Sequence, residues 1–215
     1  LIAPFVLSIA LVHALLTVIR VRPILVLGMG GFASGPGGLA AWICGRPLVI
    51  HEQNAIAGLT NSILSRVATK VLEGFPDSFP ARCRAITVGN PVRDSITSIA
   101  PPRARGTGLD TLRILVVGGS RGARALNDGV PRAIGGIDPQ MLEIRHQAGA
   151  GNEAATREAY AHTPVTVRVT EFIDDMAAAY DWADLVICRA GAITVSELAA
   201  VGVASILVPF PHAVD

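Results

Sequence analysis

The chain has 215 residues, which is enough for one large domain or two small ones. Its 18 Lys and Arg residues nearly balance its 17 Asp and Glu residues, and the net charge of +1 argues against a strongly basic nucleic-acid-binding protein. Hydrophobic residues make up 51% of the sequence and charged residues only 16%, which excludes an intrinsically disordered chain.

The cysteines of the chain, Cys44, Cys83 and Cys188, lie far apart and share no C-x-x-C spacing. Zinc sites and disulfide frameworks need closer or paired cysteines, so we expect reduced thiols in a cytosolic protein and no metal centre. The chain begins at Leu1, without Met, and stops at Asp215 just after an apolar run. We therefore expect a fragment of a longer protein.

Residues 1–19 form an apolar segment whose only polar side chains are Ser8, His13 and Thr17. As a helix the segment would be about 28 Å long, close to the thickness of the bilayer core. Arg20 and Arg22 follow, so a spanning helix would leave the rest of the chain in the cytoplasm. A strand pattern begins at once, however, and favours a helix that belongs to the domain and exposes an apolar face.

Short aliphatic runs then alternate with helical patterns along the chain, at 24–27, 47–50, 114–117, 184–188 and 204–209. This alternation predicts an α/β protein with parallel sheets covered on both faces. Residues 95–112 lack periodicity and contain Pro, Arg and Gly, so we expect a linker between two α/β units at 1–94 and 113–215. Ligands of such sheets bind beyond the carboxyl ends of the strands.

Two polar clusters follow strands of the first unit. Gly28-x-Gly30-x-x-Ala33 matches a dinucleotide-binding fingerprint, and Glu52 follows at about the right distance for a ribose hydroxyl. A tight turn with close helix packing explains the same glycines. The second cluster begins His51-Glu52-Gln53-Asn54, and turn or cap chemistry explains about half of it.

A third cluster, 118–123, matches G-x-S-x-G between a strand and a helix. One interpretation is a serine hydrolase, with Ser120, Asp184 and His212 in hydrolase order. The other is a phosphate-binding turn in which the Ser120 hydroxyl and backbone amides donate to an oxyanion. The turn follows the first strand after a linker rather than a strand in the middle of a sheet, and this favours phosphate binding.

The fourth cluster, 189–197, again places a glycine turn and a helix start after a strand. Thr194-x-x-Glu197 has the spacing of a helix capping box. Alternatively, Glu197 accepts two vicinal ribose hydroxyls, and the region of Thr194 and Ser196 cradles a diphosphate. The spacing alone leaves both interpretations open.

Taken in order, these segments resemble the MurG family of bacterial glycosyltransferases, through GMGGFASGPGGLAAW, HEQNAIAGLTN, GNPVR, ILVVGGSRGARALN, TEFIDDMAAAYDWADLVICRAGAITVSELAA and VPFPHA. Members transfer N-acetylglucosamine from UDP-GlcNAc to lipid I, the undecaprenyl-linked muramyl-pentapeptide, and form lipid II. The resemblance implies the GT-B fold: two Rossmann-like parallel-sheet domains facing across a cleft, both incomplete here. It implies an acceptor domain at 1–94 and a UDP-sugar-binding domain at 113–215.

The resemblance also implies roles for particular residues. Around the UDP diphosphate and ribose it places Ser120 and the segment Ala192, Ile193, Thr194, Val195, Ser196 and Glu197. It places the Ile173 backbone against the uracil and Glu52 on the acceptor side. It also implies that Asn54 and Arg93 of the first domain bind substrate. No cofactor or metal is implied, because fixed amides would stabilise the leaving UDP in an inverting reaction.

Two family segments are expected outside the chain: a GGTGGH-type loop upstream, whose His is the usual base candidate, and a glutamine-containing stretch downstream. We therefore assign no general base, with Glu52 and His51 as fallback candidates. The implied partners are UDP-GlcNAc, lipid I and a membrane surface, with no nucleic acid. The implied location is the cytoplasmic face of the inner membrane, as a peripheral protein. A serine hydrolase and a non-catalytic nucleotide-binding module anchored by residues 1–19 are the alternatives.

Overall fold

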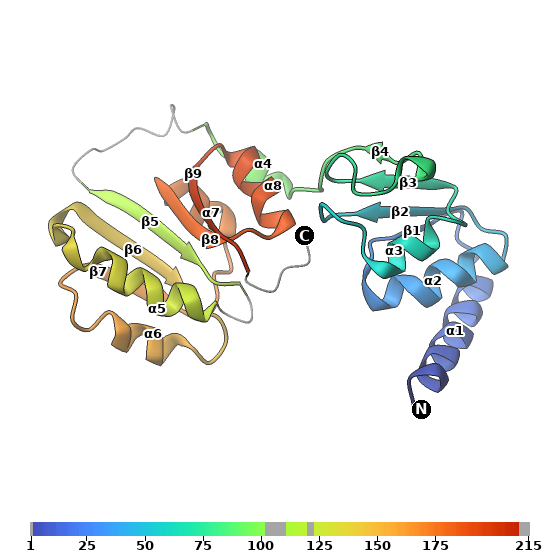
Figure 1. The fold of residues 1–215 in the computed structure, drawn as a ribbon, viewed down its shortest axis with the longest axis horizontal. Helices are drawn as coiled ribbons and strands as arrows, with labels where there is room; N and C mark the ends of the chain where they lie inside the picture. Colours follow the sequence, from blue (N-terminus) through green and yellow to red (C-terminus); the bar gives the residue numbers. More distant parts are fainter. Residues whose placement is uncertain (1, 102–110, 120–122, 211–215) are drawn as a thin grey trace. The chain divides into compact units, whose positions relative to one another are not determined.

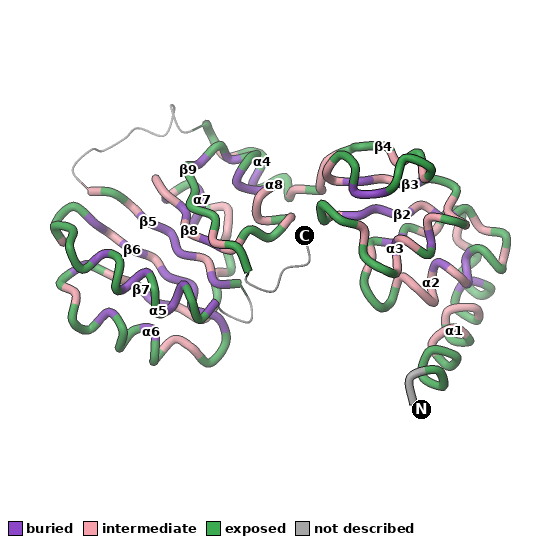
Figure 2. Tube along the Cα trace, viewed as in Figure 1, coloured by how far each residue is buried: buried purple, intermediate pink, exposed green. Residues whose placement is uncertain are grey.

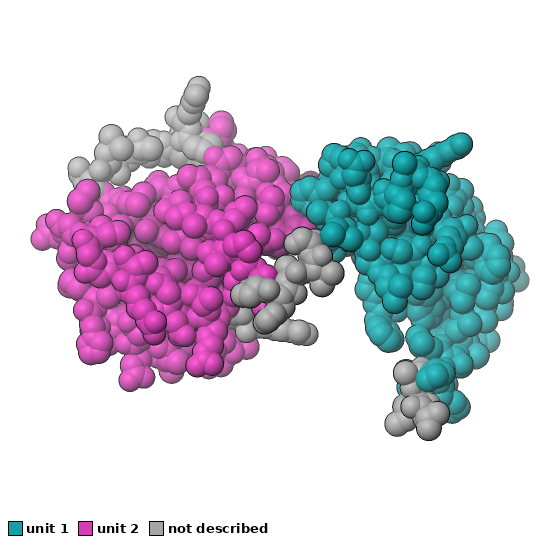
Figure 3. Space-filling view, viewed as in Figure 1, with its two compact units in different colours: residues 1–90, 215 teal, residues 91–214 magenta. Residues whose placement is uncertain are grey.

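The computed structural model describes residues 2–101, 111–119 and 123–210. It divides into two compact units, which we call unit 1 (residues 1–90) and unit 2 (residues 91–214), coloured separately in Figure 3. Each unit contains one parallel β-sheet with helices packed on it (Figure 1). The predicted α/β class with two parallel sheets is confirmed.

The sheet of unit 1 has four strands in the order β1-β2-β3-β4. They are β1 (Val26–Gly28), β2 (Leu48–Glu52), β3 (Lys70–Glu73) and β4 (Ile86–Thr87). The helices are α1 (Ile2–Val21), α2 (Gly31–Ile43), α3 (Leu59–Leu64) and the short 3-10 helix η1 (Ala81–Cys83). Leu48 and Ile50 of β2 pack against Leu64 and Phe79 in the core. At Gly38 a Cβ atom would lie 2.8 Å from Leu64 Cδ1, so this glycine lets α2 approach α3 closely.

Helix α1 packs against α2 but leaves most of its apolar surface exposed, as the green tube of α1 in Figure 2 shows. Val18 is buried, and Leu11 and Leu15 are half-buried. On the other side lies a stripe at helical spacing, which we call the α1 stripe: Phe5, Ile9, Val12, Leu16 and Ile19, all 44–69% exposed. The segment Pro4–Val21 is long and apolar enough to cross a bilayer, with 6% of it buried. The helix thus contacts its domain and exposes an apolar face.

The sheet of unit 2 has five strands in the order β7-β6-β5-β8-β9. They are β5 (Leu112–Val117), β6 (Leu142–Gln147), β7 (Thr166–Thr170), β8 (Leu185–Arg189) and β9 (Ala204–Val208). The helices are α4 (Asp94–Thr97), α5 (Arg124–Ala133), α6 (Glu153–Ala159), α7 (Met176–Trp182) and α8 (Ala192–Val201), with the 3-10 turns η3 (Ile134–Gly136) and η4 (Pro139–Met141). The strand order reverses between β5 and β8, and this reversal is the place where doubly wound sheets bind ligands.

The boundary between the units differs from the expected one. We expected residues up to 94 in the first unit and a linker over 95–112, whereas the structure assigns Pro91 onward to unit 2. Helix α4 lies within the expected linker, and its Ile96 is 1% exposed in a core that also contains Leu115 and Leu198. One buried isoleucine in an otherwise polar, proline-containing stretch explains why the composition of the segment indicated a linker. Arg93 therefore belongs to unit 2.

Candidate functional site

The turn after β5 is held by a glutamine from the neighbouring strand. Gly119 N donates to Gln147 Oε1 at 2.9 Å, and Gln147 Nε2 donates back to Gly119 O at 3.1 Å. Gly119 has a φ of 81°, which a residue with a Cβ rarely adopts. The predicted phosphate ligand Ser120 lies outside the described residues, and its role stays a prediction. The backbone on its N-terminal side is strand β5 followed by Gly118 and Gly119, as the sequence predicts.

The second turn at the reversal of the sheet leads into α8. The helix begins at Ala192 with Gly191 as its N-cap residue, and no side chain caps it. The capping-box interpretation of Thr194 and Glu197 is therefore wrong, because Thr194 lies inside the first turn rather than at the cap. The first amides of an α-helix have no carbonyl partner within the helix, so the N–H groups at Ala192, Ile193 and Thr194 can receive an anion. Ser196, in contrast, donates its hydroxyl to Ala192 O at 2.9 Å.

Glu197 lies one turn into α8 and is 7% exposed. Tyr180 of α7 donates its hydroxyl to Glu197 Oε2 at 3.0 Å. The other oxygen, Oε1, lies 3.6 Å from the Arg93 guanidinium, whose side chain is 66% exposed. The structure thus brings two predicted site residues together, and among the described residues the partner of Oε1 is the exposed Arg93 side chain.

Ile173 lies between β7 and α7 and packs against the core cluster that contains Tyr180. It also lines a cavity of about 310 Å³, together with Arg145, Arg168, Thr170, Phe172, Asp174, Asp175, Ala178 and Ala179. Arg145 stacks on the Trp182 ring, with 4.0 Å between the guanidinium carbon and the ring centroid. Ile173, the residue predicted to contact uracil, therefore lies beside a cavity, and a base-binding position needs such a cavity.

In unit 1, Glu52 ends β2 and is 3% exposed. Its Oε1 accepts from Asn54 N at 3.1 Å and Asn54 Nδ2 at 2.9 Å. Its Oε2 accepts from Gly58 N at 3.1 Å and Asn61 Nδ2 at 2.8 Å. A carboxylate has about four lone-pair positions, so these four donors use its accepting capacity. Glu52 orders the loop of residues 53–61, whose last residues begin α3, and Asn54 is one of the exposed residues in it.

His51, the other fallback base, is 5% exposed and has both ring nitrogens in hydrogen bonds. Nε2 lies 2.9 Å from Gly89 O, and since a carbonyl only accepts, this nitrogen carries the proton. Nδ1 then accepts from Gln53 Nε2 at 3.0 Å. Neither Glu52 nor His51 offers an unused acceptor, and their fallback assignment as bases stays a prediction.

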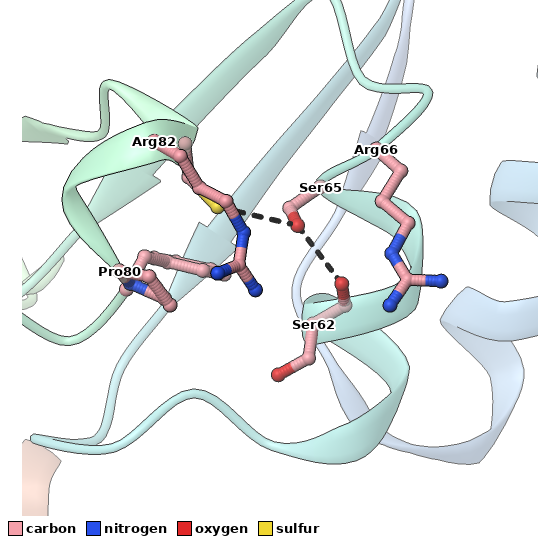
Figure 4. A pocket seen from close by; sticks show the side chains of 7 residues that line it. Ser62, Ser65, Arg66, Pro80 and Arg82 are labelled. Carbon is pink, nitrogen blue, oxygen red and sulfur yellow. Dashed lines mark hydrogen bonds between the residues drawn. The ribbon is translucent and has the colours of Figure 1, made fainter.

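A pocket of about 450 Å³ in unit 1 contains none of the predicted site residues (Figure 4). It is lined by Ser62, Ser65, Arg66, Phe79, Pro80, Arg82 and Cys83. The hydroxyl of Ser65 donates to Ser62 O at 2.9 Å, and that of Ser62 donates to Ala57 O at 3.2 Å. Because both serine protons are used within the protein, we assign no role to this pocket.

The G-x-S-x-G turn follows β5, which is the middle strand of its sheet, so the expectation that its position argues against a nucleophile elbow is wrong. The structure contradicts the serine hydrolase interpretation at Asp184 instead. This carboxylate accepts from Arg113 Nε at 3.0 Å and Arg113 Nη2 at 2.8 Å, at the amino end of β8. The hydrogen bond to Asp184 raises the pKa of Arg113. The G-x-S-x-G turn follows the opposite end of the parallel strand β5, about 13 Å away for four strand residues. Ser120 and His212 lie outside the described residues. Asp184, however, lies at the amino ends of the strands, whereas the serine follows a carboxyl end, so Asp184 is too distant for a triad with this serine.

Among the residues that the structure describes, no three His, Cys, Asp or Glu side chains gather in a way that could hold a metal ion. Cys188 is 1% exposed on β8, and burial raises the pKa of its thiol to about 11. Cys44, Cys83 and Cys188 are all free.

Comparison with known proteins decides the family. The sequence model of the glycosyltransferase family 28 N-terminal domain matches residues 1–73, and that of the C-terminal domain of the same family matches residues 113–215. The chain belongs to glycosyltransferase family 28. The resemblance to the MurG family is confirmed by relatives named UDP-N-acetylglucosamine--N-acetylmuramyl-(pentapeptide) pyrophosphoryl-undecaprenol N-acetylglucosamine transferase. The Aeromonas hydrophila protein is 54% identical over 215 residues, 100% of this chain and 59% of its own length.

The Alkalilimnicola ehrlichii relative of the same name is 57% identical, over 99% of this chain and 60% of its own length. Among solved structures, the crystal structure of MurG from Acinetobacter baumannii matches with a TM-score of 0.79 and 45% identity. That match covers 99% of this chain and 60% of the MurG chain. The chain thus spans about 60% of the relatives that it matches, and its two sheets have the GT-B type of fold.

Two residues of these sites were not predicted from the sequence. Tyr180 stands in a run of alanines, and its only signal is that a buried tyrosine hydroxyl needs a hydrogen-bond partner. Asn61 is 1% exposed and donates to both Glu52 and the His51 carbonyl. It lies nine residues from Glu52, in α3, so spacing along the sequence gave no reason to pair them.

Proposed function

We propose that the protein containing this chain transfers N-acetylglucosamine from UDP-GlcNAc to lipid I and forms lipid II, with inversion at the sugar and without a metal ion. The observation that carries the proposal is the paired arrangement at the reversal of the unit 2 sheet: free helix amides at the start of α8, and Glu197 one turn further on. The names of relatives more than 50% identical supply the substrates.

In this proposal the residues of unit 2 hold the donor. The α8 amides of Ala192 to Thr194, with Ser120, receive the diphosphate and stabilise the negative charge that UDP gains as it leaves. Glu197 accepts the ribose hydroxyls, Arg93 supports the diphosphate side, and the Ile173 backbone contacts the uracil. Unit 1 serves the acceptor through the loop of residues 53–61, with Asn54 at its surface.

The test uses the full-length protein and measures transfer of labelled N-acetylglucosamine from UDP-GlcNAc to lipid I. We expect Glu197→Ala to weaken UDP binding by about 2 kcal/mol, because a hydrogen-bonded charged acceptor is lost. The folded state should persist, since Glu197 does not cap α8. Unchanged UDP affinity in the folded variant, or no transfer by the wild type, would refute the proposal.

We further propose that the protein rests on the cytoplasmic face of the inner membrane through the α1 stripe. Its acceptor carries a polyprenyl chain, so the enzyme must reach the headgroup region. A helix with a contiguous exposed apolar face typically marks an interaction surface, and Arg20 and Arg22 at its end suit anionic lipids. No bilayer-spanning role is needed.

The membrane proposal is tested by co-sedimentation of the full-length protein with vesicles that contain anionic lipid. Replacing Phe5, Val12 and Leu16 by Gln should release the protein from vesicles and reduce turnover on lipid I, while UDP binding is kept. The matched control replaces Leu11 and Leu15, which are half-buried against the domain. This control variant should lose stability and keep most of its vesicle binding. A Gln variant of the stripe that stays vesicle-bound contradicts the proposal.

A further inference from the structure

Tyr180 is a buried residue of unit 2 that connects two helices at the donor side of the sheet. It lies on α7, is 1% exposed, and donates to Glu197 on α8 at 3.0 Å. Burial, together with the negative charge of Glu197, raises the pKa of the Tyr180 hydroxyl. The hydroxyl therefore stays protonated near neutral pH and serves Glu197 as a permanent donor.

The two oxygens of Glu197 have partners of different kinds. Oε2 is held by a hydroxyl on a ring that is itself fixed in the core. Oε1 faces Arg93, at 3.6 Å, and the Arg93 side chain is 66% exposed. An exposed arginine exchanges partners at little cost, whereas a buried tyrosine does not. Oε1 is thus the oxygen that a ligand can take over.

We propose that Tyr180 is a positioning residue for nucleotide recognition: its hydroxyl fixes the Glu197 carboxylate so that Oε1 points to the ribose hydroxyls of a uridine nucleotide. The inference rests on the proposed role of Glu197 as the ribose acceptor. A glutamate side chain has several rotatable bonds, and holding it in one conformation before the ligand arrives removes part of the ordering entropy from binding.

Helix α7 also links this contact to the expected base contact. Ile173 lies three residues before the first residue of α7 and packs against the core cluster that contains Tyr180. The residue against which uracil is expected therefore lies in the segment that leads into the helix carrying Tyr180, the residue that orients the ribose acceptor. Recognition of the base and of the sugar would depend on the same packed helix.

The experiment compares UDP with 2′-deoxy-UDP in calorimetric titrations of the full-length protein. The wild type should prefer UDP, because Glu197 loses a hydroxyl partner with the deoxy ligand. Tyr180→Phe removes only the hydroxyl. It should weaken UDP binding about tenfold and reduce the preference for UDP over 2′-deoxy-UDP, since a misplaced carboxylate gains less from the hydroxyl. In turnover assays, KM for UDP-GlcNAc should rise while kcat stays within about twofold.

The matched control is Tyr160→Phe. Tyr160 is 2% exposed in the same unit and donates to His146 rather than to Glu197. It should lower stability and leave the preference for the ribose unchanged. Equal loss of preference in both tyrosine variants, or full preference in Tyr180→Phe, overturns the inference. If Glu197→Ala itself keeps the preference, the proposed role of Glu197 fails; if Glu197→Ala loses it and Tyr180→Phe does not, only the positioning role fails.

Discussion

Glu52 of unit 1 and Glu197 of unit 2 are both buried, and the two carboxylates have different partners. Glu52 accepts four hydrogen bonds from residues 54–61, which form the loop after β2 and the start of α3. Glu197 of unit 2 accepts one hydrogen bond from a buried tyrosine and faces an exposed arginine. Burial alone therefore does not identify a ligand-binding carboxylate; the number and mobility of its existing partners do.

The largest expected effect is on stability at Glu52. Glu52→Ala leaves four donors, one of them on the buried Asn61, without their acceptor and should cost about 3 kcal/mol of unfolding free energy, measured by urea denaturation. The matched control is Glu73→Gln: Glu73 is 4% exposed in the same unit, accepts from Thr87, and its Oε2 has no partner among the described residues. Glu73→Gln should lose less unfolding free energy than Glu52→Ala. Equal losses would mean that Glu52 does not organise its loop.

The second largest effect is expected at His146, which lies in a neutral polar cluster of unit 2, in contrast to the cluster around the Glu52 carboxylate in unit 1. His146 is fully buried, donates through Nε2 to Asn127 Oδ1 at 3.0 Å and accepts at Nδ1 from Tyr160 at 2.8 Å. Burial lowers its pKa from 6.5 to about 4. Because the unfolded chain binds the proton more readily, the contribution to stability is complete above pH 6.5 and is lost as the pH falls toward 4.

The total loss at His146 should be about 3 kcal/mol, since each pKa unit corresponds to about 1.4 kcal/mol. Urea titrations between pH 7.5 and 4 measure it. In His146→Gln the part of the slope due to this residue should disappear. A wild-type protein equally stable at both pH values contradicts the neutral, buried state.

Much of the fold was predictable because it rests on local patterns. The aliphatic runs gave β1, β2, β5, β8 and β9, and the glycine turns after β5 and β8 gave the candidate donor edge. Strand β6, with the sequence LEIRHQ, was not predicted because Arg145, His146 and Gln147 interrupt its apolar pattern. They fit a central strand only because partners distant in the sequence satisfy them: Tyr160 lies 14 residues from His146 and Asn127 lies 19.

The candidate site was predictable in its residues but not in its pairings. Motif resemblance pointed to Glu197 and Arg93, and the structure brings them together. The sequence assigned Arg93 to the first domain because nothing local reveals that Ile96, three residues on, is buried in unit 2. The contact joins Tyr180 of α7 and Glu197 of α8, which are 17 residues apart, and depends on how both helices pack on the sheet. Such pairings follow from tertiary packing and leave no local signature.

Glu197→Gln tests whether the Glu197 carboxylate contributes as much to the unfolding free energy as the Glu52 carboxylate does. In Glu197→Gln the amide oxygen still accepts from Tyr180 and only the ion pair with the exposed Arg93 is lost, so we expect a loss of about 1 kcal/mol or less of unfolding free energy. Urea denaturation of this variant beside Glu52→Gln compares the two carboxylates directly. A loss at Glu197 as large as that at Glu52 would remove the distinction between them.

The smallest expected effect is at Arg93, the mobile partner of Glu197. Because its side chain is 66% exposed, its ion pair adds little to stability, and its proposed interaction with the diphosphate is screened by salt. Arg93→Ala should therefore leave the unfolding free energy unchanged and weaken UDP binding a few-fold at low salt, with the difference shrinking as salt rises. Arg157→Ala is the control, since Arg157 is 64% exposed and pairs with Glu153 in the same unit. If both variants bind UDP alike at every salt concentration, Arg93 only neutralises Glu197 in the empty protein. A weakening at Arg93 that persists at high salt would instead mean that it contacts the nucleotide from a position shielded from solvent.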